Sequence, residues 1–400
     1  MQVKQVGAGH RAIIPIMQVV IEKPHWSRRL APWVRGFDAW LLLAFALLAG
    51  LGLMTMYSVG YDFGTRFASH GRNLAIAIGV MLVFSQIPPH RLQMLGPPLY
   101  AVGVVLLLAV ALVGISRNGS QRWLNVGMVI QPSELMKVAM PLTLAWWFQR
   151  REGQMRALDF AVALVLLAVP LALILKQPDL GTSLLVLASG LFVIYFAGIR
   201  WRWILPPLVL AALGIAVLLI MSPQWCAEGV DWVVLREYQR QRVCTLIDPF
   251  RDPLGKGFHI IQGMIAIGSG GVWGKGFMQG TQTHLEFIPE RTTDFIFAAF
   301  SEEFGLIGVI VLLLIFAALI GRGLYIASQA PTLFSRLLAG AMTLNIFVYA
   351  FVNMGMVSGI LPVVGVPLPF VSYGGTAMAT LGLGLGILLS IARSDRLIKS

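Results

Sequence analysis

Several charged residues of this sequence lie within or beside long apolar runs, where polar groups are costly and are often functional. Asp294 stands at the start of one such run, and Glu302 follows about two helical turns deeper, roughly 80° around and ~12 Å along. A helix N-cap is the simpler interpretation of Asp294. An aspartate above a buried carboxylate also suits acid–base chemistry, because a positioned carboxylate can take the proton of a reacting hydroxyl.

Two more polar clusters belong to the same group of features. Glu134 and Lys137 are three residues apart and would be neighbours on a helix. They form either a self-neutralising pair or an anion site, with Lys137 in a cavity open to the outside. Asp179 precedes Thr182 by three residues, which predicts an N-cap that faces the same water-filled space.

Two segments rich in Gly or Pro complete the unusual features. Residues 268–276 read GSGGVWGKG, and because no Gly-Lys-Ser/Thr follows a strand, a nucleotide-binding loop is rejected. These glycines favour tight turns or close approach of the backbone to a ligand. Residues 361–376 read LPVVGVPLPFVSYGGT. They form either a plain re-entrant packing loop or irregular backbone that lines a cavity.

The elements that position these residues are predicted by composition. The chain is 57% hydrophobic and 12% charged, with a mean hydropathy of +0.79, whereas soluble domains carry about 25% charged residues. Uninterrupted apolar runs near 20 residues fit a bilayer roughly 30 Å thick and argue against a β-barrel. We expect an all-α polytopic integral membrane protein of about ten transmembrane helices. The predicted spans are 39–57, 73–87, 97–115, 130–148, 158–175, 180–198, 203–221, 296–320, 337–360 and 370–392.

One connection between the predicted spans is long. Residues 222–295 form a large extracytoplasmic loop between helices 7 and 8, and its apolar stretch 258–267 is too short to span, which indicates a re-entrant or interfacial helix. Residues 1–37 show no signal-peptide pattern and are expected to be a cytoplasmic N-terminal tail. Residues 38–400 then form the membrane domain.

The net charge of +12 is explained by topology. Basic residues gather at the termini and in alternate connections, including Arg150, Arg151, Arg156, Arg200 and Arg202. The positive-inside rule places these segments in the cytoplasm, together with both termini. Binding to nucleic acid is therefore unsupported.

Cys226 and Cys244 both fall in the long extracytoplasmic loop. That compartment permits a disulfide. Chance occurrence of two cysteines is the alternative, because the sequence gives no distance between them.

Four stretches together resemble the SEDS family (shape, elongation, division and sporulation proteins), and they lie in the family's order over nearly all of the helical region. They are GSQRWLNVGMVIQPSELMK (119–137), KQPDLGTS (176–183), GTQTHLEFIPERTTDFIFAAFSEEFG (280–305) and LPVVGVPLPFVSYGGT (361–376). The lead-in HLEF and the step VPLP look like the elongation branch of the family rather than its division branch.

The resemblance implies a peptidoglycan glycosyltransferase of the inner membrane that polymerises lipid II into glycan strands during cell elongation and rod-shape maintenance. It also implies work with a class B penicillin-binding protein, the transpeptidase, and with other elongation-complex proteins in membrane lipid. Asp294 falls on the family's essential aspartate. Trp123, Lys137, Asp179 and Glu302 fall on other motif positions.

The implied reaction is an inverting attack of a sugar 4-hydroxyl on an anomeric carbon, with a lipid diphosphate as leaving group. We expect Asp294 to act as general base, with its pKa raised by partial burial. Lys137, Lys275 and Arg291 would hold the diphosphate, and Ser372 completes the expected substrate-binding set. A divalent cation, Mg²⁺ or Mn²⁺, is left open as a helper, although the sequence has no recognisable metal motif.

Two other functions fit parts of the pattern. A flippase for lipid-linked precursors would also need a lipid-accessible cavity and buried charges, but it should carry functional charges toward both faces. A non-catalytic scaffold for the transpeptidase would tolerate substitution of Asp294 and Lys137.

Overall fold

The computed structural model describes residues 37–61, 64–117, 120–125, 129–226, 237–255, 257–288 and 290–399. All of them belong to one compact unit, Gly36–Ser400. The expected cytoplasmic tail therefore lies outside the described residues, apart from Phe37.

Every predicted span overlaps a helix, which confirms an all-α membrane fold. The helices are α2 (Ala39–Val59), α3 (Arg66–Ser85), α4 (Pro89–Val113), α5 (Pro132–Gln149), α6 (Ala157–Lys176), α7 (Leu180–Phe196), α8 (Trp201–Trp225), α12 (Ile296–Gln329), α13 (Leu333–Val357) and α14 (Gly375–Lys399). Eight helices in the described chain are long and apolar enough to cross a membrane. Two of the expected spans are not among these eight: α5, with Glu134 and Lys137, is too polar on average, and α7 has only 17 residues.

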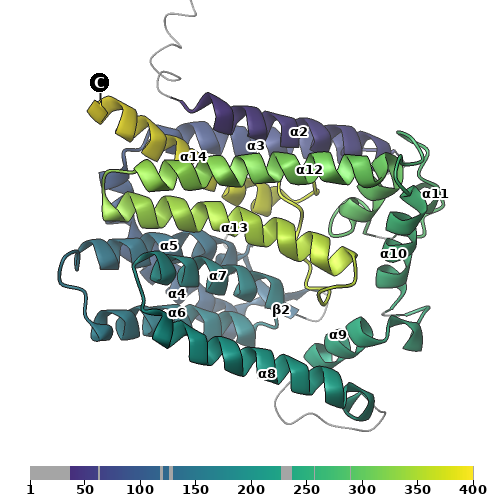
Figure 1. Ribbon diagram of the computed structural model, residues 1–400, viewed down its shortest axis with the longest axis horizontal. Helices are drawn as coiled ribbons and strands as arrows, with labels where there is room; N and C mark the ends of the chain where they lie inside the picture. The colour runs from purple at the N-terminus through teal and green to yellow at the C-terminus, as the bar shows by residue number, and fades with distance from the viewer. Residues whose placement is uncertain are drawn as a thin grey trace, which may run out of the picture. The chain divides into compact units, whose positions relative to one another are not determined.

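The helices α13 and α14 form the centre of the bundle. α13 packs on α5, α7 and α12, and α14 packs on α3. Figure 1 shows α12 and α13 lying side by side over much of their length. α8 differs, because its apolar side chains are exposed along the helix and its main element contact is with α9 (Glu237–Ile247). The bundle thus buries its middle helices and leaves apolar outer faces for lipid.

The connection between α4 and α5 is a small antiparallel sheet that the sequence did not predict. Its strands are β1 (Ile115–Arg117), β2 (Ser120–Asn125) and β3 (Val129–Ile130), in the order β1-β2-β3. Trp123 lies on β2 opposite Ile115. Strands this short give too little alternation to be recognised against the neighbouring apolar runs.

The long loop contains α9, a 3-10 turn at Pro249–Arg251, α10 (Phe258–Gly270) and α11 (Thr281–His284). α10 matches the expected short helix. A disulfide joins Cys226, just after α8, to Cys244 in α9, with their Cα atoms 5.7 Å apart. The cysteine pairing that the sequence left open is thus present, and it ties α9 to the end of α8.

The glycine-rich segment 268–276 closes a break in α12. Gly305 interrupts this helix with a φ of 62°, and a Cβ there would lie 2.3 Å from a neighbouring backbone nitrogen. Amides of residues 275 and 276 donate to the carbonyls of 302 and 303, and amides of 306 and 307 donate to those of 271 and 272. Backbone groups freed at membrane depth need such partners. The glycines of this segment thus allow its backbone to approach α12 closely.

Candidate active site

Asp294 lies in the irregular segment just before α12. The N-cap of α12 is Phe295, and it makes no side-chain cap bond, so the N-cap interpretation of Asp294 is wrong. The backbone of Asp294 is instead held from α13, where the amide of Asn353 donates to the carbonyls of Asp294 (2.9 Å) and Val366 (2.7 Å). The carboxyl group of Asp294 therefore does not cap α12.

The loop 361–376 fixes the same segment from the other side. The Ser372 hydroxyl donates to the Thr293 carbonyl at 2.7 Å and accepts from the Leu368 amide at 2.8 Å. The amide of Tyr373 donates to the Thr292 carbonyl at 2.8 Å. Ser372 is buried, so its visible role is to position the backbone next to Asp294.

The carboxyl of Asp294 is partly buried, and its pKa follows from its surroundings. Burial is the main cause that raises the pKa of Asp294, from 3.8 to about 6; the negative charge of Glu290 raises it further, and the positive charge of Arg242 opposes both. Gly365, with a φ of 75°, lies beside it, and a Cβ there would be 3.2 Å from Asp294 Oδ2. A pKa near neutrality is the property a general base needs.

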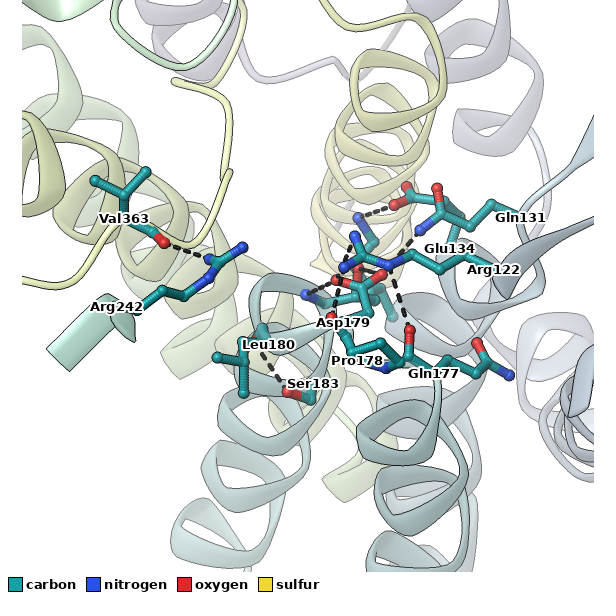
Figure 2. Close-up of polar contacts among 12 residues, drawn as sticks. Arg122, Gln131, Glu134, Gln177, Pro178, Asp179, Leu180, Ser183, Arg242 and Val363 are labelled. Atoms are coloured by element: carbon teal, nitrogen blue, oxygen red, sulfur yellow. Dashed lines mark hydrogen bonds and ion pairs between the residues drawn. The ribbon is translucent and has the colours of Figure 1, made fainter. Parts of the chain in front are cut away.

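Successive residues of the loop 361–376 connect this aspartate to two other elements. Arg242 of α9 donates to the Val363 carbonyl. The next carbonyl, of Val364, would lie 2.8 Å from a Cβ on Gly181 at the start of α7. Gly365, the next residue, lies beside Asp294. Residues 363–365 therefore contact α9, α7 and the aspartate in turn. Figure 2 shows Arg242 and Val363 on one side of the first turn of α7.

On the other side of that turn, Asp179 organises a second cluster (Figure 2). It is the N-cap of α7, as predicted, and accepts from the Thr182 amide at 3.2 Å and hydroxyl at 2.9 Å. Gln131 donates at 3.0 Å to Oδ2, the oxygen that also accepts from the Thr182 hydroxyl, and Arg122 pairs with Oδ1 at 3.6 Å. A second role of Asp179 toward substrate stays a prediction.

Lys137 is buried in α5 and paired inside the protein. Its ammonium lies 2.7 Å from Glu134 and also donates to the Tyr349 hydroxyl of α13. The self-neutralising pair is thus present. Lys137 is only 2% exposed, so its contact with a substrate stays a prediction.

Glu302 and Lys275, both expected to bind substrate, bind each other. Lys275 Nζ lies 2.7 Å from Glu302 and 2.6 Å from the Thr281 hydroxyl. The carboxylate also accepts from the amides of Gln282 (2.8 Å) and Thr283 (3.2 Å) at the start of α11. These contacts hold the loop onto α12, and they direct Glu302 toward α11.

Arg291 is likewise turned into the protein. It is 2% exposed, its Nε donates to the Val59 carbonyl at the end of α2 at 3.2 Å, and it pairs with Glu286 at 3.8 Å. This side chain anchors the segment that carries Asp294 to α2.

The structure therefore brings Ser372 to the segment that carries Arg291 and Asp294. Lys137 and Lys275 are paired with carboxylates of α5 and α12. Reasoning from sequence missed Arg242, Asn353 and Arg122. Two of them could have been found from the sequence. Arg242 lies two residues before Cys244, and Asn353 is a polar residue within an apolar span. Within the described ranges, no group of three or more His, Cys, Asp or Glu side chains could hold a metal ion.

Fold and site together define a multi-pass helical membrane protein with a partly buried aspartate at one end of its bundle. Residues 38–397 match the family described as "Cell cycle protein", the FtsW, RodA and SpoVE family. The chain belongs to this family, the SEDS family that its motifs resemble.

Relatives and solved structures agree with this membership. The chain is 48% identical to the peptidoglycan glycosyltransferase MrdB of Escherichia coli K12 over 352 residues, 88% of this chain and 92% of MrdB. It is 34% identical to stage V sporulation protein E of Bacillus subtilis, over 90% of this chain and 98% of that protein. A chain of a peptidoglycan synthase complex, solved to show how polymerization and crosslinking are coordinated, has a TM-score of 0.73 at 32% identity and covers 90% of this chain and 98% of its own. The rod shape determining protein RodA of Thermus thermophilus has a TM-score of 0.66 at 26% identity, over 91% and 99%.

Proposed function

We propose that the protein is a peptidoglycan glycosyltransferase that polymerises lipid II into glycan strands during cell elongation. The observation that carries this proposal is Asp294. Its backbone is clamped by α13 and by the loop 361–376, and burial holds its pKa at about 6. The 48% identity to a named peptidoglycan glycosyltransferase supports the same class of reaction.

In the proposed reaction, the 4-hydroxyl of one sugar attacks the anomeric carbon of another. As the new C–O bond forms, the bond from the anomeric carbon to the lipid diphosphate breaks, and the hydroxyl proton passes to the Asp294 carboxylate. A diphosphate leaves without protonation when cations neutralise it, so one general base is sufficient. The configuration at the anomeric carbon is inverted.

The cations best placed for the diphosphate are arginines that sequence analysis did not select. Arg242 acts on Asp294 electrostatically and contacts the adjoining loop, and Arg122 lies across the start of α7. Lys137, Lys275 and Arg291 remain proposed contributors, with their charged ends on Glu134, Glu302 and the end of α2. Arg242 and Arg122 are likewise bound, to the Val363 carbonyl and to Asp179. Arginine also suits this task, because its planar guanidinium can bind phosphate oxygens in pairs.

The proposed setting is the inner membrane, with both termini in the cytoplasm and the Asp294 end of the bundle at the extracytoplasmic face. The distribution of basic residues supports this orientation. A class B penicillin-binding protein, with other elongation-complex proteins, is the proposed partner. The structural similarity to a chain of a peptidoglycan synthase complex supports a partner of this kind.

The test is polymerisation of labelled lipid II by the purified protein, alone and with its cognate transpeptidase, on a gel that resolves glycan chains. Wild type should form polymer, and Asp294→Asn should form none while it remains folded. Asp248→Asn makes the same change at another carboxylate of the long loop and should keep activity. Movement of lipid II across liposomes without polymer would favour a flippase, and polymer from Asp294→Asn would show that this carboxylate is not the base.

A further inference from the structure

A cavity lies at the end of the bundle opposite Asp294. It has a volume of about 830 Å³ and is lined by the first turns of α6, the connection between α7 and α8, and the first turn of α8. α6 has 20 residues and is therefore about 30 Å long, and the Asp179 cluster lies beyond its far end. The cavity is thus a membrane thickness away from the proposed reaction and belongs to no part of it.

The charged side chains that line this α6–α8 cavity are all cationic. Arg156, Arg200 and Arg202 line it, and the described lining contains no Asp or Glu. The nearest carboxylate on α6, Asp159, is buried, accepts from the Arg156 amide at 2.8 Å and pairs with Arg151 at 3.5 Å. Three guanidinium groups around one hollow therefore favour an anion.

The rest of the lining is apolar and open to the membrane. Leu158 and Leu164 of α6 and Trp203 of α8 line the cavity and are exposed. α8 itself packs on little besides α9, so the space beside it is not filled by another described helix. A tryptophan at this level is typical of the membrane–water interface. The walls suit hydrocarbon chains, and the arginines suit a charged headgroup at their end.

We propose that the α6–α8 cavity binds an anionic phospholipid, with its phosphate on Arg156, Arg200 and Arg202 and its acyl chains along the apolar walls of α6 and α8. Basic pockets between transmembrane helices on the cytoplasmic side are suited to such headgroups, and the volume is that of a small-molecule site. The lipid would connect the start of α8 to α6, which α8 otherwise hardly contacts. This inference does not depend on the reaction proposed for Asp294.

Native mass spectrometry of the purified protein in detergent tests the proposal, with cardiolipin, phosphatidylglycerol and phosphatidylethanolamine titrated as probes. Wild type should bind the first two more tightly than the zwitterionic lipid. Each arginine near a membrane surface is worth roughly fivefold in affinity, so Arg156→Gln/Arg200→Gln/Arg202→Gln should weaken cardiolipin binding roughly 100-fold.

The matched control removes three arginines outside the cavity, as Arg91→Gln/Arg150→Gln/Arg336→Gln, and should bind lipid like wild type. If the cavity triple variant does not fold, Arg200→Gln alone should still show the roughly fivefold loss. Three results would overturn the proposal: cavity variants that bind cardiolipin like wild type, a control that loses as much, and equal binding of phosphatidylethanolamine. Inorganic pyrophosphate that competes as strongly as lipid would also overturn it, by showing a site for soluble anions.

Discussion

The pH dependence of polymerisation tests the role of Asp294 most quantitatively. Burial and Glu290 raise the pKa of Asp294 from 3.8 to about 6. A general base acts in its ionised form, so activity should rise with pH through about 6. Roughly one-tenth of the carboxyl groups are ionised one pH unit below the pKa and roughly nine-tenths one unit above it. Activity should therefore fall about tenfold between pH 7 and pH 5, whereas an unshifted aspartate would lose almost nothing over this range.

The rise of activity with pH through about 6 is the acid limb of the profile. Two substitutions should shift this limb in opposite directions. Arg242 favours the charged form of Asp294, so Arg242→Gln should raise the pKa of Asp294 and shift the limb to higher pH. Glu290 disfavours the charged form, so Glu290→Gln should lower the pKa of Asp294 and shift the limb to lower pH. Glutamine keeps a polar side chain at both positions.

The assay is kcat/KM for labelled lipid II from pH 5 to 8, for wild type and both variants in one detergent and one salt concentration. Titration of the substrate contributes equally to all three profiles, so the differences between profiles report on the protein. Shifts of the same sign, or a limb that neither variant moves, would contradict the assignment of the limb to Asp294.

Three further changes test how the site is held. Lys137→Met should lower the free energy of unfolding by up to about 3–5 kcal/mol, because it leaves the partly buried Glu134 without its cation, and Glu134→Gln/Lys137→Met should recover most of this in thermal unfolding. Cys226→Ser/Cys244→Ser should cost about 2–4 kcal/mol and lower polymerisation, because α9 loses its tie to α8; a thiol reductant should weaken wild type and leave this variant unchanged. Ser372→Ala should cost about 1–3 kcal/mol and lower kcat more than it changes KM, since its contacts are to backbone groups of the protein. A rise in KM at unchanged kcat would instead favour direct substrate binding by Ser372.

The helices were predictable because length and hydropathy of each run are enough to define a span. Every predicted span overlaps a helix. The differences are at the helix ends; α3, for example, begins at Arg66 instead of residue 73. The N-cap at Asp179 and the pairing of Glu134 with Lys137 followed from local spacing, which the structure keeps. The same kind of local rule was wrong at Asp294, because α12 begins one residue later, with Phe295 as its N-cap.

The arrangement of the site was less predictable, because it depends on contacts between distant segments. The sequence placed Glu302 beneath Asp294, but Glu302 accepts from donors 19 to 27 residues earlier in the chain. Arg242 reaches the carbonyl of Val363, 121 residues away. Spacing along the chain carries no information on such pairs. The disulfide was left open for the same reason, since it depends on a distance between two elements.

The most direct test of the central claim separates binding from chemistry in Asp294→Asn. Binding of labelled lipid II to the purified variant in nanodiscs would be measured beside single-turnover polymerisation. We predict binding within a few-fold of wild type, because a neutral amide of the same shape keeps the surroundings of Asp294, and no detectable glycan product. Polymer formed by Asp294→Asn at a rate near that of wild type would contradict the claim that Asp294 is the base.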